Sequence, residues 1–318
     1  MLHPKSIPPS VQRGLLGIVG AGALAHAFAA SWAQRAVGGE GCVQVWARTP
    51  GAGRALQDAV QAAIGEPAEI GAVCLLESIG ELASVRTIIL AVKDKDLAQA
   101  ARELAQYPAQ GPRRVVLHAS GALGVDVLAP LEAAGYAVGR CHPLVSLRVK
   151  ADVRAFRGVG FSLAGKDIAM ERATRLAEYM GGWVLPPVVE PGKYVQYHAA
   201  ASLLAGGLSV LFEPALAAMT QALGDRDAAR RGLIQLLRSV ATHLGGVEPR
   251  EALTGPSSRG DVEVVRAHLQ ELPKAGADLY RVLLPAMLNM AQDRGTLSTE
   301  DRMRLDTLLS EDSEDSEG

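Results

Sequence analysis

The chain has 318 residues, of which 48% are hydrophobic and 21% are charged, and its formal net charge at pH 7 is −2. This length exceeds what one hydrophobic core supports well, so two folded domains are expected. A chain this close to neutral lacks the basic field that attracts phosphate backbones, which excludes nucleic acid as the expected partner and favours a small molecule.

The two ends and the cysteines bear on the compartment. Residues 1–13 hold three prolines and no continuous apolar run, so no signal peptide is expected, and both 1–13 and the acidic 310–318 are expected to be flexible. Cys42, Cys74 and Cys141 lie far apart without CxxC spacing. That spacing argues against a metal site, a redox pair or a disulfide framework, and it favours a cytoplasmic protein.

The first half alternates short β-branched runs with alanine- and leucine-rich helical segments, the pattern of a Rossmann-like parallel sheet. The second half has helical spacing only. We therefore expect an α/β fold, with a dinucleotide-binding domain at 14–190 and a helical substrate or dimerisation domain at 191–309. Strands are expected at 15–19, 43–47, 72–75, 87–91, 114–118, 137–141, 160–164 and 183–185.

A glycine motif follows the first of these strands. Gly20, Gly22 and Ala25 form GxGxxA at the start of an alanine-rich helix, with Ala23 and Leu24 between them. The first glycine permits a tight turn, the second allows close approach of a pyrophosphate, and the third small residue allows helix and strand to pack. The motif predicts a dinucleotide site at a helix N-terminus, with a plain glycine turn as the alternative.

The end of the second strand bears on which dinucleotide binds. NAD-selective sites usually carry an acidic residue about 20 residues beyond the glycine loop, whereas this chain has Arg48 there. A guanidinium cannot accept a ribose hydroxyl but can pair with a 2′-phosphate, so NADP(H) is favoured, with Thr49 and Arg54 as further donors. The alternative is that Arg48 is only an exposed charge at a strand end.

The fourth strand leads into a charged segment. Val92 and Lys93 are expected near the ribose on the nicotinamide side, because parallel strands deliver their carboxyl ends to the cofactor crevice. Asp94 and Asp96 are more readily explained as caps of the next helix.

Two histidine segments follow the fifth and sixth strands. His118 precedes Ser120, and His142 precedes Pro143, so all these side chains are expected at the ligand-binding edge of the sheet. Either histidine can be a proton donor, a substrate ligand or a structural residue. His142 is the preferred acid, because a short turn there would aim its ring into the crevice, and Ser120 is expected to bind substrate.

A third segment, 252–261, gathers polar residues before a helix. Ser257, Arg259 and Asp261 lie within it, and a helix N-terminus beside an arginine suits a carboxylate substrate. Asp261 can equally be the N-cap of that helix, with Glu263 in its first turn.

The segment 193–223 is almost wholly apolar and about 45 Å long if helical. Glu213 and Pro214 interrupt it and no second such segment follows, so a buried central helix is preferred to a membrane span. A helical domain of this size cannot easily cover that surface alone. A homodimer is therefore expected, without a membrane partner.

Together these motifs resemble a bacterial family of oxidoreductase-like proteins. Its members join a Rossmann-like domain to a C-terminal helical domain of unknown function. The segments that carry the resemblance are GxGxxA, Val-Lys-Asp-Lys-Asp, His-Ala-Ser-Gly-Ala-Leu, His-Pro-Leu-Val-Ser, Tyr-His-Ala-Ala-Ala and Ala-Leu-Thr-Gly-Pro-Ser-Ser-Arg-Gly-Asp.

The family is similar in architecture to pyrroline-5-carboxylate reductase, ketopantoate reductase, deazaflavin-dependent NADP oxidoreductases and the β-hydroxyacid dehydrogenases. The resemblance implies a 6-phosphogluconate dehydrogenase-like helical domain used for dimerisation, an active site between the domains, and a cleft-facing His198. Hydride transfer to or from a small carboxylate-bearing carbonyl or imine is the expected activity, with His142 and His198 as acids. A non-catalytic dinucleotide sensor on the same fold is the rival.

Overall fold

The computed structural model describes residues 16–35, 42–65, 73–111, 114–148, 150–188, 190 and 192–314. The chain forms two compact units, divided between Ser202 and Leu203, and each is described by itself. The expected flexible segment 1–13 and the expected strand starts at 15 and 72 lie outside the described residues. Residues 310–314 continue the last helix to Glu314, and the flexibility of the tail stays a prediction.

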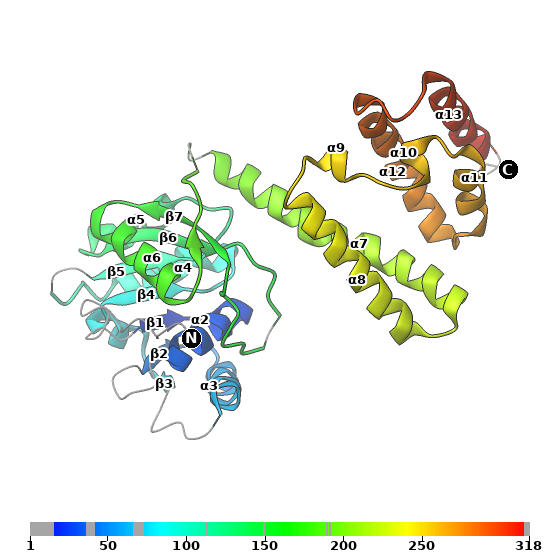
Figure 1. Ribbon diagram of the computed structural model, residues 1–318. Coiled ribbons are helices and arrows are strands. Elements are labelled where there is room, and N and C mark those ends of the chain that lie inside the picture. The colour runs from blue at the N-terminus through cyan, green and yellow to red at the C-terminus, as the bar shows by residue number, and fades with distance from the viewer. Residues whose placement is uncertain are drawn as a thin grey trace. The chain divides into compact units, whose positions relative to one another are not determined.

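The first unit is built on a sheet of eight strands in the order β3-β2-β1-β4-β5-β6-β7-β8 (Figure 1). All eight predicted strands are present, and central strands such as β4 and β5 are wholly buried, as strands covered on both faces must be. Their bounds are β1 Leu16–Val19, β2 Val43–Trp46, β3 Val73–Leu75, β4 Thr87–Leu90, β5 Val115–His118, β6 Ala137–Pro143, β7 Gly160–Gly165 and β8 Trp183–Val184.

One pairing departs from the expected parallel sheet. β7 runs antiparallel to β6, while every other described pair is parallel. A parallel return needs a crossover, usually a helix, and the described residues between Pro143 and Gly160 form none. β6 also extends to Pro143, so His142 lies within the strand and not in a turn after it.

Helices cover both faces of the sheet. One core joins the sheet to α2 (Ala23–Arg35), α3 (Pro50–Ile64) and α6 (Asp167–Tyr179). The other core joins it to α4 (Asp94–Ala105), α5 (Ala129–Ala133) and the 3-10 turns η1 (Ile79–Ser84) and η2 (Val125–Leu128). The sheet is therefore a rigid base from which loops emerge at two opposite edges.

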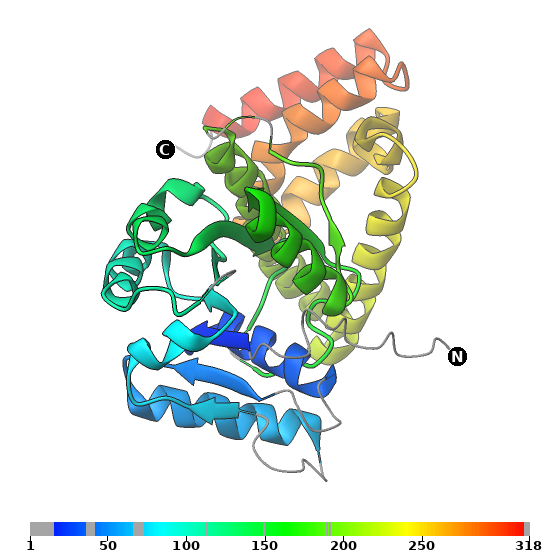
Figure 2. The ribbon, with the colours of Figure 1, turned by 90° about the vertical axis from the view of Figure 1, so that its left-hand side faces the viewer.

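The second unit is helical. Its core is formed by side chains of α11 (Val262–Glu271), α12 (Lys274–Asp293) and α13 (Thr299–Glu314). α12 and α13 lie side by side in both views (Figures 1 and 2). Before them come α8 (Arg226–Leu244), α9 (Pro249–Ala252) and α10 (Pro256–Arg259).

Helix α7 (Lys193–Leu223) is continuous across the division between the units. The expectation that it is a buried central helix is wrong for the single chain, because few of its apolar residues are buried and Leu203 is 77% exposed. Apolarity predicts that a surface is covered, but not whether the same chain covers it. By length and composition, α7 is the one helix among the described residues that could cross a membrane, a test that core helices of soluble proteins also pass.

The cysteines also differ from expectation. Cys42 and Cys74 form a disulfide, while Cys141 is free and buried. Pairing of β2 with β3, in which Gln44 lies opposite Cys74, brings the two sulfurs together from positions 32 residues apart. Three free thiols were therefore a wrong prediction, and the cysteines no longer argue for a reducing compartment.

Candidate functional site

The glycine loop has the geometry that its motif predicts. Gly20 has φ +122°, its N–H donates to the Trp46 carbonyl, and a Cβ here would lie 2.5 Å from the Ala91 carbonyl oxygen. A Cβ on Gly22, in contrast, would meet no atom within 4 Å. The fold itself requires Gly20, whereas Gly22 leaves open space beside the start of α2, as a bound pyrophosphate would need.

Arg48 lies at the carboxyl end of β2 and is mostly exposed. Its guanidinium is 4.0 Å from carboxylates of Asp96 and Glu103, both on α4. Exposed pairs at this distance contribute little, so a phosphate can displace them. Thr49 occupies the N-cap position of α3 but makes no side-chain capping bond, and Arg54 is exposed on that helix. The three predicted donors therefore lie close together in sequence, from the end of β2 into the first turns of α3.

The segment after β4 stays beside the glycine loop, because the Ala91 N–H donates to the Val19 carbonyl. Lys93 is exposed and occupies the N-cap position of α4, with Asp94 and Asp96 in the first turn. The expectation that the aspartates cap this helix is therefore wrong, although negative charge in a first turn still suits the helix dipole. Val92 is half-buried against the first unit's core.

The loop after β5 uses its polar groups internally. His118 is fully buried and its Nδ1 accepts the Ser120 N–H at 3.2 Å. Burial, and next the Arg140 guanidinium, lowers the pKa of His118 to about 3, so its ring is neutral. The Ser120 hydroxyl accepts the N–H groups of Ala122 and Leu123. Both residues thus serve the loop's structure in this unit.

Arg140 is a fully buried cation that the sequence analysis did not single out. Its Nε and Nη2 donate to the carbonyls of Ser120 and Gly121, each at 2.9 Å, and its Nη1 donates to Ser162 Oγ at 2.7 Å. Its guanidinium also lies over the rings of Tyr194 and Tyr197, at 4.5 and 5.3 Å. No carboxylate pairs with Arg140 among the described residues, so neutral groups alone hold its charge.

His142 lies two residues beyond Arg140 on the same strand. Its Nδ1 is 3.0 Å from the Tyr197 hydroxyl, and its ring centroid is 6.4 Å from that of His198. Burial, followed by Arg140 and His198, lowers the pKa of His142 to about 4. The ring is therefore neutral at pH 7 and acts as a hydrogen-bond donor and acceptor rather than as an imidazolium.

Glycine is needed where the loop after β5 meets these rings. A Cβ on Gly121 would lie 2.5 Å from Cδ2 of His198 and 2.8 Å from Nε2 of His142. The first unit therefore brings together the two histidines that the sequence predicted as acids. It adds Tyr194 and Tyr197 at the start of α7, which the sequence analysis missed although Tyr197 adjoins His198.

The strand register places this cluster at the cofactor edge. Val19, Leu90, His118 and Arg140 are in register across β1, β4, β5 and β6, and His142 lies further toward the carboxyl edge. Neighbouring strands are about 4.8 Å apart, so β6 lies about 14 Å from β1. The glycine loop and His142 therefore share one edge of one rigid sheet.

The predicted substrate loop lies in the second unit. Ser257 is buried, and its hydroxyl oxygen lies 3.9 Å from Met287 Sδ. Arg259 pairs with Asp261 at 2.9 Å. Asp261 occupies the N-cap position of α11, with Glu263 in the first turn, but its side chain makes no capping bond. That this loop faces His142 stays a prediction.

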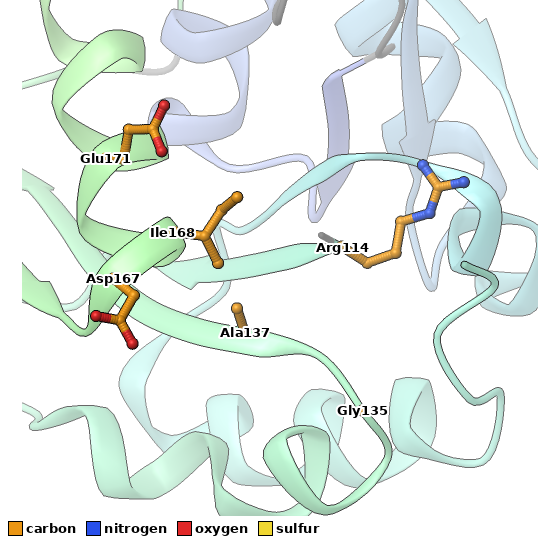
Figure 3. Close-up of a pocket in the computed structure, with 6 residues that line it drawn as sticks. All are labelled: Arg114, Gly135, Ala137, Asp167, Ile168 and Glu171. Atoms are coloured by element: carbon orange, nitrogen blue, oxygen red, sulfur yellow. The ribbon is translucent and has the colours of Figure 1, made fainter. Parts of the chain in front are cut away.

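A depression of about 530 Å³ lies at the opposite edge of the sheet (Figure 3). It is lined by Arg114, Gly135, Ala137, Asp167, Ile168 and Glu171, where β5, β6 and α6 begin. Acidic and basic side chains face it from different elements, and it is remote along the strands from the glycine loop. The active site that the resemblance implies therefore stays a prediction. No group of three metal-ligating side chains occurs among the residues that the structure describes.

Comparison with known proteins supports this architecture. Residues 8–143 match the family described as a Rossmann-like domain, and residues 159–286 match Domain of unknown function DUF2520. The chain thus joins a Rossmann-like domain to a C-terminal helical region of the DUF2520 type, which confirms the resemblance. The second match begins near β7, so it includes the last strands of the sheet. No curated protein matches the chain.

Several solved structures share the fold. A Bacteroides fragilis protein provisionally named an NADP oxidoreductase is 19% identical, with TM-score 0.67, covering 87% of this chain and 99% of its own. Plasmodium falciparum pyrroline carboxylate reductase with NADP bound is 11% identical, with TM-score 0.58 and coverages of 90% and 98%. Coxiella burnetii pyrroline-5-carboxylate reductase is 15% identical, with TM-score 0.57 and coverages of 88% and 98%. The chain has the fold of dinucleotide-dependent oxidoreductases.

Proposed function

We propose that this protein is an NADP(H)-dependent oxidoreductase acting on a small carbonyl or imine substrate that bears a carboxylate. The observation that carries the proposal is the placement of a neutral, hydrogen-bonded His142 at the same sheet edge as the open glycine loop. NADP bound to one reductase of the same fold supports the choice of cofactor.

The residues present fit a dinucleotide. The backbone at Gly22 faces open space in which a pyrophosphate could lie, and N–H groups at the start of α2, around Ala23 and Leu24, suit that pyrophosphate. Arg48, Thr49 and Arg54 would hold the 2′-phosphate, and Val92 and Lys93 would flank the ribose near the nicotinamide. The bound cofactor supplies or accepts the hydride.

His142 then orients the reacting oxygen or nitrogen. A neutral imidazole can donate one hydrogen bond to the charge that develops there, and His198 would add a second polar group. Arg259 is proposed to bind the substrate's carboxylate, with Asp261 orienting the Arg259 guanidinium and with Ser257 and Ser120 supporting their loops from within. No nucleic acid or membrane partner is needed for this chemistry.

Cofactor choice is testable by fluorescence titration with NADPH and NADH. Arg48→Ala should weaken NADPH binding by about 1–3 kcal/mol, the scale of hydrogen bonds to a charged group, and leave NADH binding nearly unchanged. Gly22→Val should abolish binding of both dinucleotides, because the valine side chain would occupy the space that the pyrophosphate needs. The control Arg102→Ala removes another exposed arginine, on α4, and should change neither. Equal losses of NADPH and NADH affinity in Arg48→Ala would contradict NADP(H) selectivity.

Activity is tested by a steady-state screen of NADPH with ketoacids, aldehydes and cyclic imines. His142→Asn should lower turnover at least about 100-fold while keeping cofactor affinity. If the wild-type chain binds NADPH but turns over nothing in the panel, the non-catalytic sensor replaces the oxidoreductase.

We also propose a homodimer that covers α7. Apolar side chains along this helix are exposed in the single chain, among them Leu203, Leu204, Leu208, Val210 and Leu211. Covering them with a second copy is expected to bury more than ~1,600 Å² in total. Light scattering in detergent-free buffer should give a dimer mass at micromolar concentration. A monomer mass would contradict the dimer, and a requirement for detergent would favour a membrane instead.

A further inference from the structure

We infer that Tyr197 is the immediate proton source for His142, and that Arg140 and Ser162 fix the direction in which that proton moves. The inference deepens the proposed function and rests on it. It comes from two hydrogen-bonded pairs within the first unit, Arg140 with Ser162 and His142 with Tyr197, on β6, β7 and the first turns of α7.

The direction follows from what each group can do. A guanidinium only donates, so Ser162 Oγ must accept from Arg140 Nη1, at 2.7 Å. The hydrogen of Ser162 is then free to turn toward the Tyr197 oxygen, and the nearby Ser162 hydroxyl accordingly lowers the pKa of Tyr197. Tyr197 in turn keeps its own hydrogen for Nδ1 of His142, at 3.0 Å. In this series, each hydrogen from Arg140 through Ser162 and Tyr197 is therefore directed toward His142.

The series of side chains from Arg140 to Tyr197 fixes the tautomer of His142. Since Nδ1 accepts from Tyr197, the single proton of the neutral ring resides on Nε2. Nε2 is the ring atom nearest the space that a Gly121 side chain would occupy, beside His198. His142 is thus held with its N–H donor at Nε2.

Burial makes Arg140 effective in this role. It is fully buried, no carboxylate pairs with it among the described residues, and it lies over the Tyr197 ring at 5.3 Å. A buried cation of this kind stabilises negative charge that forms nearby. Burial raises the pKa of Tyr197, and Arg140 offsets part of that rise, so Arg140 favours a transient phenolate on Tyr197 without having to move.

Two protons move in the proposed step, one from His142 and one from Tyr197. If a bound nicotinamide supplied hydride to the carbonyl or imine carbon, the Nε2–H bond of His142 would break and its proton would join the substrate oxygen or nitrogen. The Tyr197 O–H bond breaks as its proton joins Nδ1, leaving a phenolate beside Ser162 and Arg140. A proton from water at Nε2, with return of the Nδ1 proton to Tyr197, restores the starting state. The net reaction takes up one proton from solvent.

The first test needs no substrate. Long-range ¹⁵N–¹H spectra of the full ¹⁵N-labelled chain at pH 7 report the tautomer of each of its seven histidines, and His142→Asn identifies the His142 signals. The wild type should show His142 protonated at Nε2, and Tyr197→Phe should shift it toward the Nδ1–H form. Tyr194→Phe is the matched control, since Tyr194 also lies against Arg140 but is not part of the series of side chains that leads to His142. In this variant His142 should keep the Nε2–H form. An Nδ1–H tautomer or an imidazolium in the wild type would overturn the inference.

The second test uses turnover. Tyr197→Phe should lower kcat about 100-fold or more with KM changed only a few-fold, as expected for loss of a proton donor. Tyr136→Phe, which removes a buried hydroxyl bonded to the Tyr107 carbonyl elsewhere in the unit, should keep kcat. Unchanged kcat in Tyr197→Phe would overturn the proton role even if the tautomer is as expected. A wild type that turns over no substrate would defeat the oxidoreductase and its proton step, while the spectra decide separately on the hydrogen-bond chain.

Discussion

Two arginines of this protein have opposite surroundings in the structure. Arg140 is fully buried among neutral partners, whereas Arg259 is exposed and pairs with Asp261 two residues away. Arg140 draws its partners from the loop after β5, from β7 and from α7, while Arg259 takes its partner from its own loop. Burial and distant partners mark the site in the first unit, and local pairing marks the loop in the second.

The difference teaches how polar groups acquire a role. A charge that is satisfied within its own loop can be exchanged for water or a ligand at little cost. A buried charge with partners on several elements fixes those elements, because each lost partner leaves an unsatisfied polar group. The first arrangement can receive a ligand, and the second can orient reacting groups.

The largest expected effect is on Arg140. Arg140→Met keeps a long side chain but leaves the Ser120 and Gly121 carbonyls and Ser162 without a donor. The free energy of unfolding should fall by about 3 kcal/mol or more, as for other buried charged networks that lose one partner. Denaturant unfolding followed by circular dichroism measures this loss. A decrease below ~1 kcal/mol would remove the contrast with Arg259.

A smaller effect is expected from pH. The pKa values of His118 and His142 are lowered to about 3 and about 4 in the folded chain, while unfolded histidine titrates near 6.5. Between these values the unfolded state binds more protons, so stability is full above pH 6.5 and falls as pH decreases toward 4. The slope is about 1.4 kcal/mol per pH unit for each histidine.

Unfolding curves at pH 7, 6 and 5 test this dependence. His142→Asn should reduce the slope by about one proton, whereas His243→Asn, at an exposed position on α8, should leave it unchanged. A slope that is the same in the wild type and in His142→Asn would show that His142 is not held neutral by burial.

The smallest expected effect is on Arg259. Arg259→Met should change the free energy of unfolding by less than about 1 kcal/mol, because the pair with Asp261 is exposed. The same variant should raise KM for a carboxylate substrate if the loop receives it. A large loss of stability would mean that this loop, like the surroundings of Arg140, is primarily structural.

Much of the fold could be predicted from the sequence, because short buried strands and helical spacing are local patterns. All eight strands and the glycine loop followed from such patterns, whereas the position of His198, now found near His142, was implied by the family resemblance. The reversal of β7 could not be predicted, since strand direction depends on how the chain returns after β6. The pairing of Cys42 with Cys74 depends likewise on two strands that meet only in the folded sheet.

The site was predicted less fully. Arg140 lies in an apolar strand, where a charge gives no periodic pattern, and its importance comes only from burial and from partners distant in sequence. The sequence did offer one indication of a functional Arg140, namely a single arginine inside a strand predicted to be buried. Ser120 and Ser257 illustrate the opposite error, because their hydroxyls lie in promising loops but bond within their own unit.

The antiparallel pairing of β6 with β7 has a mechanical consequence. Directly opposed residues, here His142 and Ser162, are held at a fixed spacing by the ladder, as is Arg140 on the same strand. Tyr197 alone among the four is carried by a helix. A displacement of the first turns of α7 by about 1 Å would lengthen the bond from Tyr197 to His142 beyond hydrogen-bonding range, while the other three side chains kept their separations. The two strands thus fix the spacing of Arg140, His142 and Ser162, and among these four side chains Tyr197 at the start of α7 is the one whose distance to His142 can change.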